Sequence, residues 1–269
     1  MTAWYEESFG KEYLSLYAHR DLAEACANIS AIHALLALSK DEPLLDLACG
    51  AGRCLVALRR AGFHRLVGLD LSADLLQAAA EALTDEGVAE APIVTPGAHD
   101  LPEPAPQRVV LVQADMRRIP YRDYFATILS IFTSFGYFEA DDENEAVLRS
   151  AYDALRPGGV FLMDYLSRDW VIDNLVPEDE RRQPGRHVHN RRRLSPDGRR
   201  VEKVTTVTPD GGEAHQFRES VRLYSESDMR RLLAAAGFRS VAAYGSLSGD
   251  CCTPQSSRLV LVAHKEPCP

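Results

Sequence analysis

The chain has no apolar run close to the roughly 20 residues that a helix needs to cross a membrane. Residues 1–7 also lack the basic start and the apolar middle of a signal peptide. The 6 cysteines include no C-x-x-C pair and show no spacing typical of a metal site, so neither a disulfide framework nor a zinc site is indicated. We therefore expect a reduced, cytoplasmic protein that binds no metal ion and no membrane.

Positive charge is also scarce, because 39 acidic side chains outnumber 30 basic ones and the net charge is −9. Such a surface does not favour nonspecific binding of nucleic acid. A P-loop and a nucleophile elbow are both missing, which argues against kinase and hydrolase chemistry. With 269 residues, of which 46% are hydrophobic, the chain can bury a full core in one domain with an appendage.

A glycine turn stands out near the start of the chain. An apolar run at residues 44–47 is long enough for one buried parallel strand, and Gly50 and Gly52 separate it from a helix-like run at residues 54–60. Glycine permits a sharp turn and lets a ligand approach the backbone, and the unpaired N–H groups of the helix's first turn face the same place. Asp46, at the end of the strand, repels a pyrophosphate and attracts an ammonium group.

The residue pattern of this turn distinguishes between two classes of cofactor. A nicotinamide or flavin site has the pattern G-x-G-x-x-G, but Leu55 stands where the third glycine would be, so a dehydrogenase is the less favoured interpretation. The observed D-x-x-x-G-x-G resembles motif I of the class I S-adenosylmethionine-dependent methyltransferases. In that family the acid holds the amino group of the cofactor's methionine part, and the glycine turn passes beneath the cofactor. The resemblance implies a cofactor site that includes Asp46, Ala48, Gly50, Gly52 and Arg53.

A second strand is predicted at residues 64–70 and ends in another acid, Asp70. Asp70 lies eighteen residues after Gly52, close to the spacing of about 20 residues at which an acid meets a ribose. A carboxylate can accept hydrogen bonds from both ribose hydroxyls. We expect Asp70 and the adjacent Leu71 to contact the cofactor, the alternative being a plain turn aspartate. Ser72 is expected to cap the helix that follows.

The strand predicted at residues 108–113 is followed by Ala114, Asp115 and Met116. Members of the resembled family often carry an acid at this place, next to the adenine amino group, so the resemblance adds these three residues to the expected cofactor site. Residues 87–107, before this strand, are rich in proline and show little periodicity. We expect a long connection that is dispensable for folding.

An aromatic, glycine-containing loop at residues 132–138 follows a fourth strand predicted at residues 125–131. Ligands of open α/β sheets bind outside the carboxyl ends of the strands. We therefore expect this loop, which begins at Phe132 and resembles a stretch of some small-molecule methyltransferases, to line the pocket where cofactor and acceptor meet. The alternative is that its aromatics only cover the sheet. Candidates for a general base are Tyr137, Asp164 and Tyr165.

The sheet domain is completed by two helices and three strands. The sequence L-R-P-G-G at residues 155–159 matches the L-x-P-G-G that the resembled family places before its fifth strand. Gly237 is expected to close the last helix. The helices are expected at residues 141–154 and 226–236, and the strands at residues 160–164, 238–245 and 258–264.

The N-terminal residues 1–39 are interpreted as a helical cap. Apolar side chains at residues 13–17 follow a helical spacing, which by itself indicates packing. In the resembled methyltransferases, however, the N-terminal helices fold over the cofactor pocket. The resemblance therefore makes Tyr13, Tyr17 and Arg20 candidates for contact with the cofactor.

Residues 166–224 are interpreted as an inserted antiparallel sheet that forms a lid. Two turn signals separate strand-like runs at residues 186–194, 199–208 and 213–224. His187 and His189 share one strand face, but no third metal ligand is near in the sequence. Arginines are concentrated at residues 181–203, which suits an anionic acceptor, RNA phosphates or a solvated sheet face.

Together these patterns predict a Rossmann-like α/β fold with a seven-stranded, mostly parallel sheet. The methyltransferase domain is expected at residues 40–165 and 225–269, between the cap and the inserted lid. The expected activity is transfer of a methyl group from S-adenosylmethionine to a nitrogen or oxygen atom of a small-molecule acceptor, for which alignment is the main requirement. An RNA methyltransferase that uses the arginine-rich insert and a domain that binds the cofactor without catalysis remain alternatives. The sequence does not predict an oligomeric state.

Overall fold

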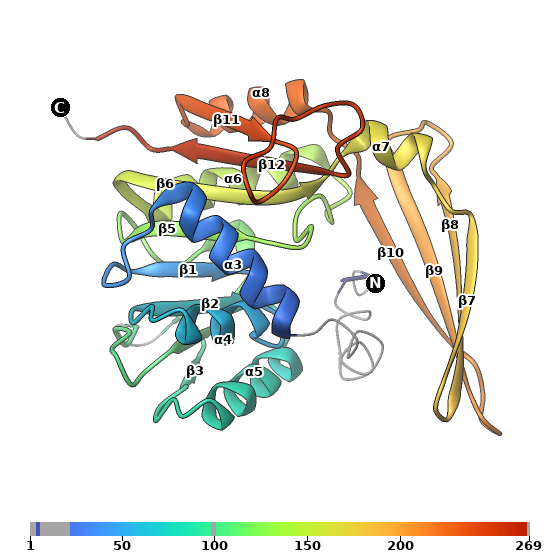
Figure 1. Cartoon of the computed structure of the whole chain (residues 1–269), viewed down its shortest axis with the longest axis horizontal. Coiled ribbons are helices and arrows are strands. Elements are labelled where there is room, and N and C mark those ends of the chain that lie inside the picture. Colours follow the sequence, from blue (N-terminus) through green and yellow to red (C-terminus); the bar gives the residue numbers. More distant parts are fainter. Residues whose placement is uncertain (1–3, 6–21, 98–100, 268–269) are drawn as a thin grey trace.

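The computed structural model describes residues 4–5, 22–97 and 101–267, and its main feature is an eight-stranded sheet (Figure 1). Neighbouring strands are parallel except at the last strand in the chain, which runs antiparallel to both of its neighbours. In spatial order the strands are β11 (Ser240–Tyr244), β12 (Arg258–His264), β6 (Leu155–Leu166), β5 (Phe125–Ser130), β1 (Leu44–Leu47), β2 (Leu66–Asp70), β4 (Val110–Gln113) and β3 (Ile93–Val94).

The central strands are buried on both faces because successive side chains point to opposite sides of the sheet. Leu44 and Leu66 belong to the apolar cluster on one face, whereas Leu45 and Val67, the next residues along, belong to the cluster on the other face. This explains why β1 reads as a continuous apolar run broken only by Asp46. The fold is therefore the expected mostly parallel α/β sheet.

Helices cover both faces of the sheet (Figure 1). One face packs against α3 (Leu22–Leu36), α4 (Arg53–Arg60) and α5 (Ala73–Asp85), and the other against α6 (Asp141–Ala154) and α8 (Glu226–Ala236). Two short helices, η1 (Met116–Arg118) and α7 (Arg168–Asp173), complete the set that the structure describes. As expected, the Ser72 hydroxyl caps α5 by accepting the Leu75 N–H, and Gly237 ends α8 with a left-handed backbone. None of the helices among the described residues is long and apolar enough to cross a membrane.

The sheet has eight strands rather than the predicted seven, and the additional strand is β3. It lies inside the proline-rich segment interpreted as a connection, and it pairs with β4 through only two residues, Ile93 and Val94. Two residues are too few to show a period in the sequence, which is why the strand was missed. β6 also begins earlier than predicted, because the L-R-P-G-G stretch already pairs with its neighbours.

The insert forms a separate four-stranded antiparallel sheet rather than the three strands predicted. The additional strand is β7 (Glu178–Gln183), which reads E-D-E-R-R-Q and gives no apolar signal. Charged side chains are common on edge strands, where they hinder unwanted pairing. The other strands are β8 (Arg186–Leu194), β9 (Arg200–Pro209) and β10 (His215–Arg222).

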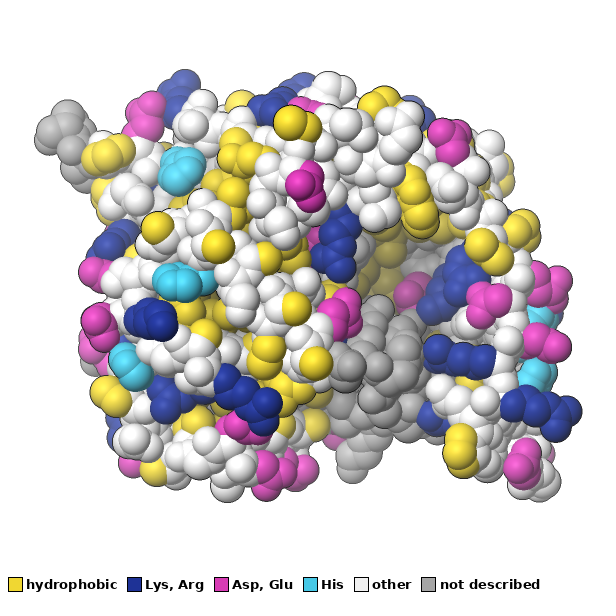
Figure 2. Space-filling view, in the orientation of Figure 1, with side chains coloured by type: hydrophobic (Ala, Val, Ile, Leu, Met, Phe, Trp, Pro, Cys, Tyr) yellow, Lys and Arg dark blue, Asp and Glu magenta, His cyan; other side chains and the backbone are white. Residues whose placement is uncertain are grey.

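This inserted sheet has a buried face and an exposed face. Val188, Val207 and Phe217 form its small apolar cluster, and Val201 and Val221, on the same face by strand register, pack against the core of the α/β domain. Figure 2 shows that the molecule is hollowed between the α/β body and this sheet. The buried face is therefore the one that turns toward the body.

Candidate active site

The carboxyl ends of the parallel strands surround a cavity of about 500 Å³. This is the edge at which open α/β sheets bind their ligands. Residues from the turns after β1, β2, β4 and β5 meet there, together with Tyr5. The lining residues are Tyr5, Ala48, Gly50, Leu69, Asp70, Leu71, Ser72, Ala73, Asp74, Leu75, Ala114, Asp115, Met116, Ser134, Tyr137 and Phe138.

The turn after β1 is built from left-handed backbone conformations. Ala48, Gly50 and Gly52 have φ values of 60°, 54° and 77°. A Cβ on Gly52 would lie 2.9 Å from the Cβ of Ala79 in α5, so glycine lets the two helices pack closely. A Cβ on Gly50 would meet no atom within 4 Å. Gly50 therefore leaves its side of the backbone open toward the cavity, which suits a ligand lying against the turn.

Asp70 links this turn to the end of β2. Its Oδ2 accepts the Gly50 N–H at 2.8 Å, and its Oδ1 accepts the Ser72 N–H at 2.9 Å. Burial raises the pKa of Asp70, and these N–H donors oppose the shift. Each carboxylate oxygen has a second lone pair, so Asp70 can still accept hydrogen bonds from a ligand in the cavity.

Asp46 lies beneath the turn and is almost completely buried. Its Oδ2 has no hydrogen-bond partner among the residues that the structure describes, and neither has the buried Nη1 of Arg53. Burial and the charge of Asp70 raise the pKa of Asp46 to about 7, although Arg53 opposes the shift. A buried carboxylate without a partner is costly. A cationic ligand at this place would satisfy it.

Asp115 lies on the cavity wall after β4, but Arg117 holds its carboxylate. The Arg117 N–H and Nε donate to Asp115 Oδ1 at 2.8 and 3.0 Å. Burial alone would raise the pKa of Asp115, yet these bonds leave it below its usual value. Arg117 also pairs with Glu143 and lies over the Phe138 ring, 4.3 Å from its centroid. Asp115 is thus a fixed, ionised acceptor.

The loop after β5 supplies the opposite wall through Ser134, Tyr137 and Phe138. The Tyr5 and Phe138 rings pack edge to face with centroids 5.3 Å apart, and the Trp4 and Tyr137 rings do so at 5.5 Å. The sequence predicted that the loop at residues 132–138 lines the pocket and named Tyr137 within it, but it did not predict Tyr5 at the site. For Tyr5, the available signal was its position in an aromatic-rich opening segment.

The structure places the other two base candidates in the protein interior. Asp164 Oδ2 accepts hydrogen bonds from Arg258 Nη1 at 2.8 Å and from the Phe132 N–H at 3.1 Å. Burial raises the pKa of Asp164, and Arg258 opposes the shift. The Tyr165 hydroxyl is buried and donates to the Arg222 carbonyl oxygen. Neither side chain lines the cavity, whereas Tyr137 does.

The remaining predicted cofactor residues fall into three groups. Leu71, Ala114 and Met116 line the cavity with Asp70 and Asp115. Phe132 and Arg53 are not among the lining residues but contact each other, with the Arg53 Cζ 4.6 Å from the Phe132 ring centroid. Phe132 has a φ of 62°, an uncommon conformation for a bulky residue that marks the turn after β5 as constrained. Tyr13, Tyr17 and Arg20 lie outside the described residues.

Strand register divides the arginines and histidines of β8 between the two faces of the inserted sheet. Arg192 lies on the buried face and pairs with Asp179, whereas Arg193 lies on the exposed face and pairs with Glu202 at 2.8 Å. His187 and His189 lie on the exposed face, 3.2 and 2.5 Å from glutamates of β7. No group of three or more potential metal ligands occurs in residues 4–5, 22–97 and 101–267.

A family model described as "Methyltransferase domain" matches residues 17–243 of the chain. Among curated proteins, the Streptomyces venezuelae protein named dTDP-3-amino-3,4,6-trideoxy-alpha-D-glucopyranose N,N-dimethyltransferase is 28% identical over 211 residues. That alignment covers 77% of this chain and 79% of the relative.

Two solved structures have similar folds. The S-adenosylmethionine-dependent methyltransferase from Clostridium acetobutylicum superposes with a TM-score of 0.74 at 17% identity, covering 95% of this chain and 98% of that one. Streptomyces venezuelae DesVI superposes with a TM-score of 0.63 at 26% identity, covering 95% of this chain and 97% of the other. The similarity therefore includes the inserted sheet as well as the sheet domain.

Proposed function

The chain belongs to the class I S-adenosylmethionine-dependent methyltransferases, and from this premise we propose that it methylates an amine nitrogen of a small, anionic acceptor. Methyl transfer to a small-molecule acceptor follows from the family. The nitrogen, the anionic group and the residues that act on them are our proposal. The buried Asp46 carboxylate at the glycine turn, whose Oδ2 has no hydrogen-bond partner among the described residues, is the observation that carries the site assignment.

The residues around the turn fit S-adenosylmethionine. In its ionised form Asp46 would hold the ammonium group of the methionine part, Gly50 would allow close approach of the backbone, and Asp70 would accept the ribose hydroxyls. Asp115 and Met116 would lie at the adenine. S-adenosylmethionine supplies a methyl group that is already activated, so the protein has mainly to align the acceptor and exclude water.

Tyr137 is the base candidate that the geometry favours, because it lies on the cavity wall and the other two candidates are hydrogen-bonded in the interior. An amine acceptor is protonated near neutral pH and must lose a proton before its lone pair can attack. A tyrosine hydroxyl is ordinarily protonated at neutral pH. Tyr137 would therefore receive the amine's proton only as a phenolate; as a phenol it would orient the amine by a hydrogen bond, and the proton would pass to a water molecule before the free amine attacks.

The choice of an amine with an anionic group has two supports. The Streptomyces venezuelae relative is named for an amino sugar attached to a nucleoside diphosphate. By strand register, the buried face of the inserted sheet carries Arg192 and Lys203. We propose that residues 166–224 act as a lid that holds the anionic part of the acceptor.

The two alternatives have less support. Neither relative described above is named as an RNA methyltransferase, and the arginines of β8 are divided between two faces rather than forming one basic surface. A domain that binds the cofactor without catalysis would not need the aromatic wall at Tyr137 and Phe138. Methyl transfer is therefore favoured over both.

The test uses the purified protein with radiolabelled S-adenosylmethionine and three acceptor probes. The probes are the amino-sugar nucleotide named for the Streptomyces venezuelae relative, the same amino sugar without its nucleotide, and a short unstructured RNA. We expect the label to enter the sugar nucleotide faster than the free sugar, and not the RNA. Binding of S-adenosylhomocysteine without transfer to any amine would contradict the proposal and favour a non-catalytic domain.

A further inference from the structure

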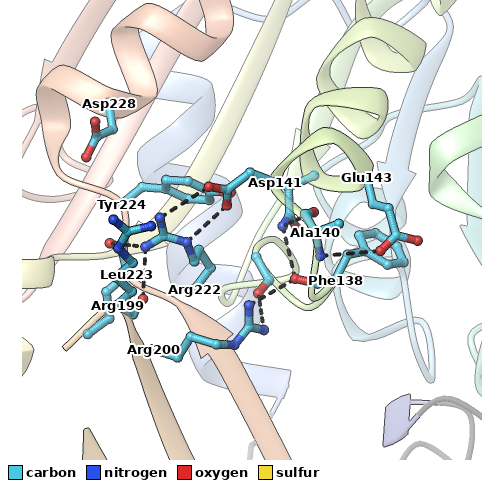
Figure 3. Close-up of polar contacts among 12 residues, drawn as sticks. Phe138, Ala140, Asp141, Glu143, Arg199, Arg200, Arg222, Leu223, Tyr224 and Asp228 are labelled. Atoms are coloured by element: carbon cyan, nitrogen blue, oxygen red, sulfur yellow. Dashed lines mark hydrogen bonds and ion pairs between the residues drawn. The ribbon is translucent and has the colours of Figure 1, made fainter. Parts of the chain in front are cut away.

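Arg200, at the start of β9, reaches across to the loop that forms the acceptor-side wall of the cavity (Figure 3). Its Nη1 donates to the Phe138 carbonyl oxygen at 3.0 Å. Its Nη2, which has two N–H groups for three acceptors, shares one of them between the carbonyl oxygens of Gly136 at 3.2 Å and Tyr137 at 3.3 Å. One guanidinium therefore contacts three consecutive carbonyl groups of the loop.

The same guanidinium also holds its own sheet. Its Nε donates to the Ser220 hydroxyl at 2.8 Å, and its Nη2 donates to the Ser220 carbonyl oxygen at 2.9 Å. All of these bonds end on neutral oxygens. Burial lowers the pKa of Arg200, so the site holds this cation against a desolvation cost. Arg200 thus joins β10 of the inserted sheet to residues 136–138.

A second connection lies beside the first. Arg222 is the register partner of Arg200, and its backbone N–H donates to the Gly136 carbonyl oxygen at 2.8 Å. Its side chain pairs with Asp141 at the start of α6, with Nε and Oδ1 3.0 Å apart. The Tyr224 hydroxyl donates to the same Asp141 oxygen at 2.6 Å (Figure 3). The end of β10 is therefore fixed to both ends of the segment that carries Tyr137.

The backbone conformation at Gly136 restricts how the loop at residues 136–138 can pack against β10. Gly136 has a φ of 89°, and a Cβ at this position would lie 3.2 Å from the Arg222 carbonyl oxygen. Asn144 gives one further hold, because its Nδ2 donates to the Phe138 carbonyl oxygen at 3.1 Å. Arg200 is nevertheless the side chain that bonds to the carbonyl groups on both sides of Tyr137 as well as to that of Tyr137 itself.

We propose that Arg200 is a positioning residue for methyl transfer, which fixes the acceptor-side loop at residues 136–138 to the inserted sheet. The inference rests on the proposed function, because it takes Tyr137 and Phe138 as the acceptor-side wall. The backbone carbonyls are locked while the two aromatic rings remain on the cavity wall. Errors of about 1 Å in the alignment of reacting groups can cost 100-fold in rate, so a fixed wall has a direct catalytic use.

The planar fork of arginine is central to this role. Arginine presents five N–H donors in fixed directions, whereas lysine offers one compact ammonium group on a flexible stem. A lysine at position 200 would keep the charge but could not span Ser220 and the three loop carbonyls together. The Arg200→Lys variant therefore distinguishes a role that needs the planar guanidinium from a role that needs only a buried positive charge.

The first experiment needs no acceptor. Hydrogen exchange of the peptide that covers residues 132–139 would be followed in the wild type, Arg200→Gln, Arg200→Lys and the control Arg199→Ala, whose side chain is exposed. We expect exchange about tenfold faster in Arg200→Gln, a smaller increase in Arg200→Lys, and no change in the control. Affinity for S-adenosylhomocysteine, measured by calorimetry, should stay within about twofold in every variant.

The second experiment measures kinetics with the best acceptor from the labelled-methyl assay. Arg200→Gln and Arg200→Lys should lower kcat/KM for the acceptor by at least about tenfold with the KM for S-adenosylmethionine unchanged. Wild-type exchange and kinetics in folded Arg200→Lys would overturn the clamp, and so would a parallel loss of cofactor affinity. Absence of cofactor binding or methyl transfer in the wild type would instead count against the proposed function, so the two failures are distinguishable.

Discussion

The backbone N–H of Gly50 donates to Asp70 Oδ2 at 2.8 Å, so the acid that ends β2 also fixes the glycine turn that follows β1. The two residues stand 20 apart in the sequence and belong to different βα units. Parallel neighbouring strands end at the same edge of a sheet, which brings them together. One carboxylate can therefore shape the turn and present its remaining lone pairs to a ribose.

Replacing Asp70 should weaken cofactor binding. We expect Asp70→Ala to reduce the affinity for S-adenosylhomocysteine by about 1.5–3 kcal/mol, which is typical for the loss of a hydrogen bond to a charged group. The measurement is calorimetric titration, with circular dichroism to confirm the fold. Asp85→Ala, which removes an exposed carboxylate at the far end of α5 and outside the cavity lining, serves as the matched control. Unchanged affinity in a folded Asp70→Ala protein would remove Asp70 from the site.

Cofactor binding should depend on pH through Asp46. Its pKa is raised from 3.8 to about 7 in the folded protein, so it is mostly protonated at pH 6. An ammonium group binds the ionised form, and binding must then release a proton. We expect the affinity for S-adenosylhomocysteine to fall by up to about tenfold per unit as the pH drops below 7, and to level off above it. Titrations in buffers of different ionisation enthalpy would count the proton.

The same shift has a consequence for stability, with the opposite sign. Because the folded pKa exceeds the unfolded one, the contribution of Asp46 to the cofactor-free protein is fully present below about pH 4 and is lost as the pH rises through 7. Asp46→Asn should flatten both profiles between pH 5 and 7. Any slope that remains in the stability profile is assigned to Asp70 and Asp164, whose pKa values are also raised by burial. An unaltered binding profile in Asp46→Asn would separate Asp46 from the ammonium group.

The proline-rich segment contains a packed part, although its dispensability for folding remains a prediction. Val88 is buried in the core, and the Glu90 N–H donates to the Gln107 carbonyl oxygen at 3.0 Å. We therefore restrict the prediction of dispensability for folding to residues 96–102. A Gly/Ser replacement of equal length should shift the melting temperature by only a few degrees, the effect of less than about 1 kcal/mol. Val88→Ala, the control that removes core contacts, should lower the melting temperature further. Loss of the fold on replacing residues 96–102 would show that this segment packs against the rest of the protein.

The sequence predicted those elements and site residues that leave a local pattern in the chain, and it missed those that depend on contacts with distant residues. Asp46, Gly50 and Asp70 could be predicted as site residues because charge and backbone freedom at the ends of apolar runs have direct chemical meaning. β7 was not predicted because a charged edge strand forms by pairing with its neighbour, and its own side chains give no apolar alternation. The contacts of Arg200 could not be predicted either, because its partners at residues 136–138 lie 62 to 64 positions away in the sequence.

The last prediction concerns how the inserted sheet selects the acceptor, and the strand register makes it sharper than the sequence allowed. From sequence, Arg191, Arg192 and Arg193 formed one basic run. In the structure Arg192 turns to the buried face with Asp179, whereas Arg191 and Arg193 are exposed on the opposite face. Of these three arginines, only Arg192 is on the face that an anionic acceptor held between the sheet and the body would meet.

Arg192→Ala should therefore raise the acceptor KM by about tenfold, the value of a charge-assisted contact of roughly 1.5 kcal/mol. The double variant Arg191→Ala/Arg193→Ala removes twice the charge from the exposed face, and we expect it to leave the acceptor KM unchanged at 0.15 M salt, where exposed charges are screened within about 8 Å. Steady-state kinetics with the sugar nucleotide would measure both. An equal rise in the double variant would mean that the insert attracts the acceptor only by its overall charge. A fall in affinity for S-adenosylhomocysteine in Arg192→Ala, with the acceptor KM unchanged, would assign the insert to the cofactor instead.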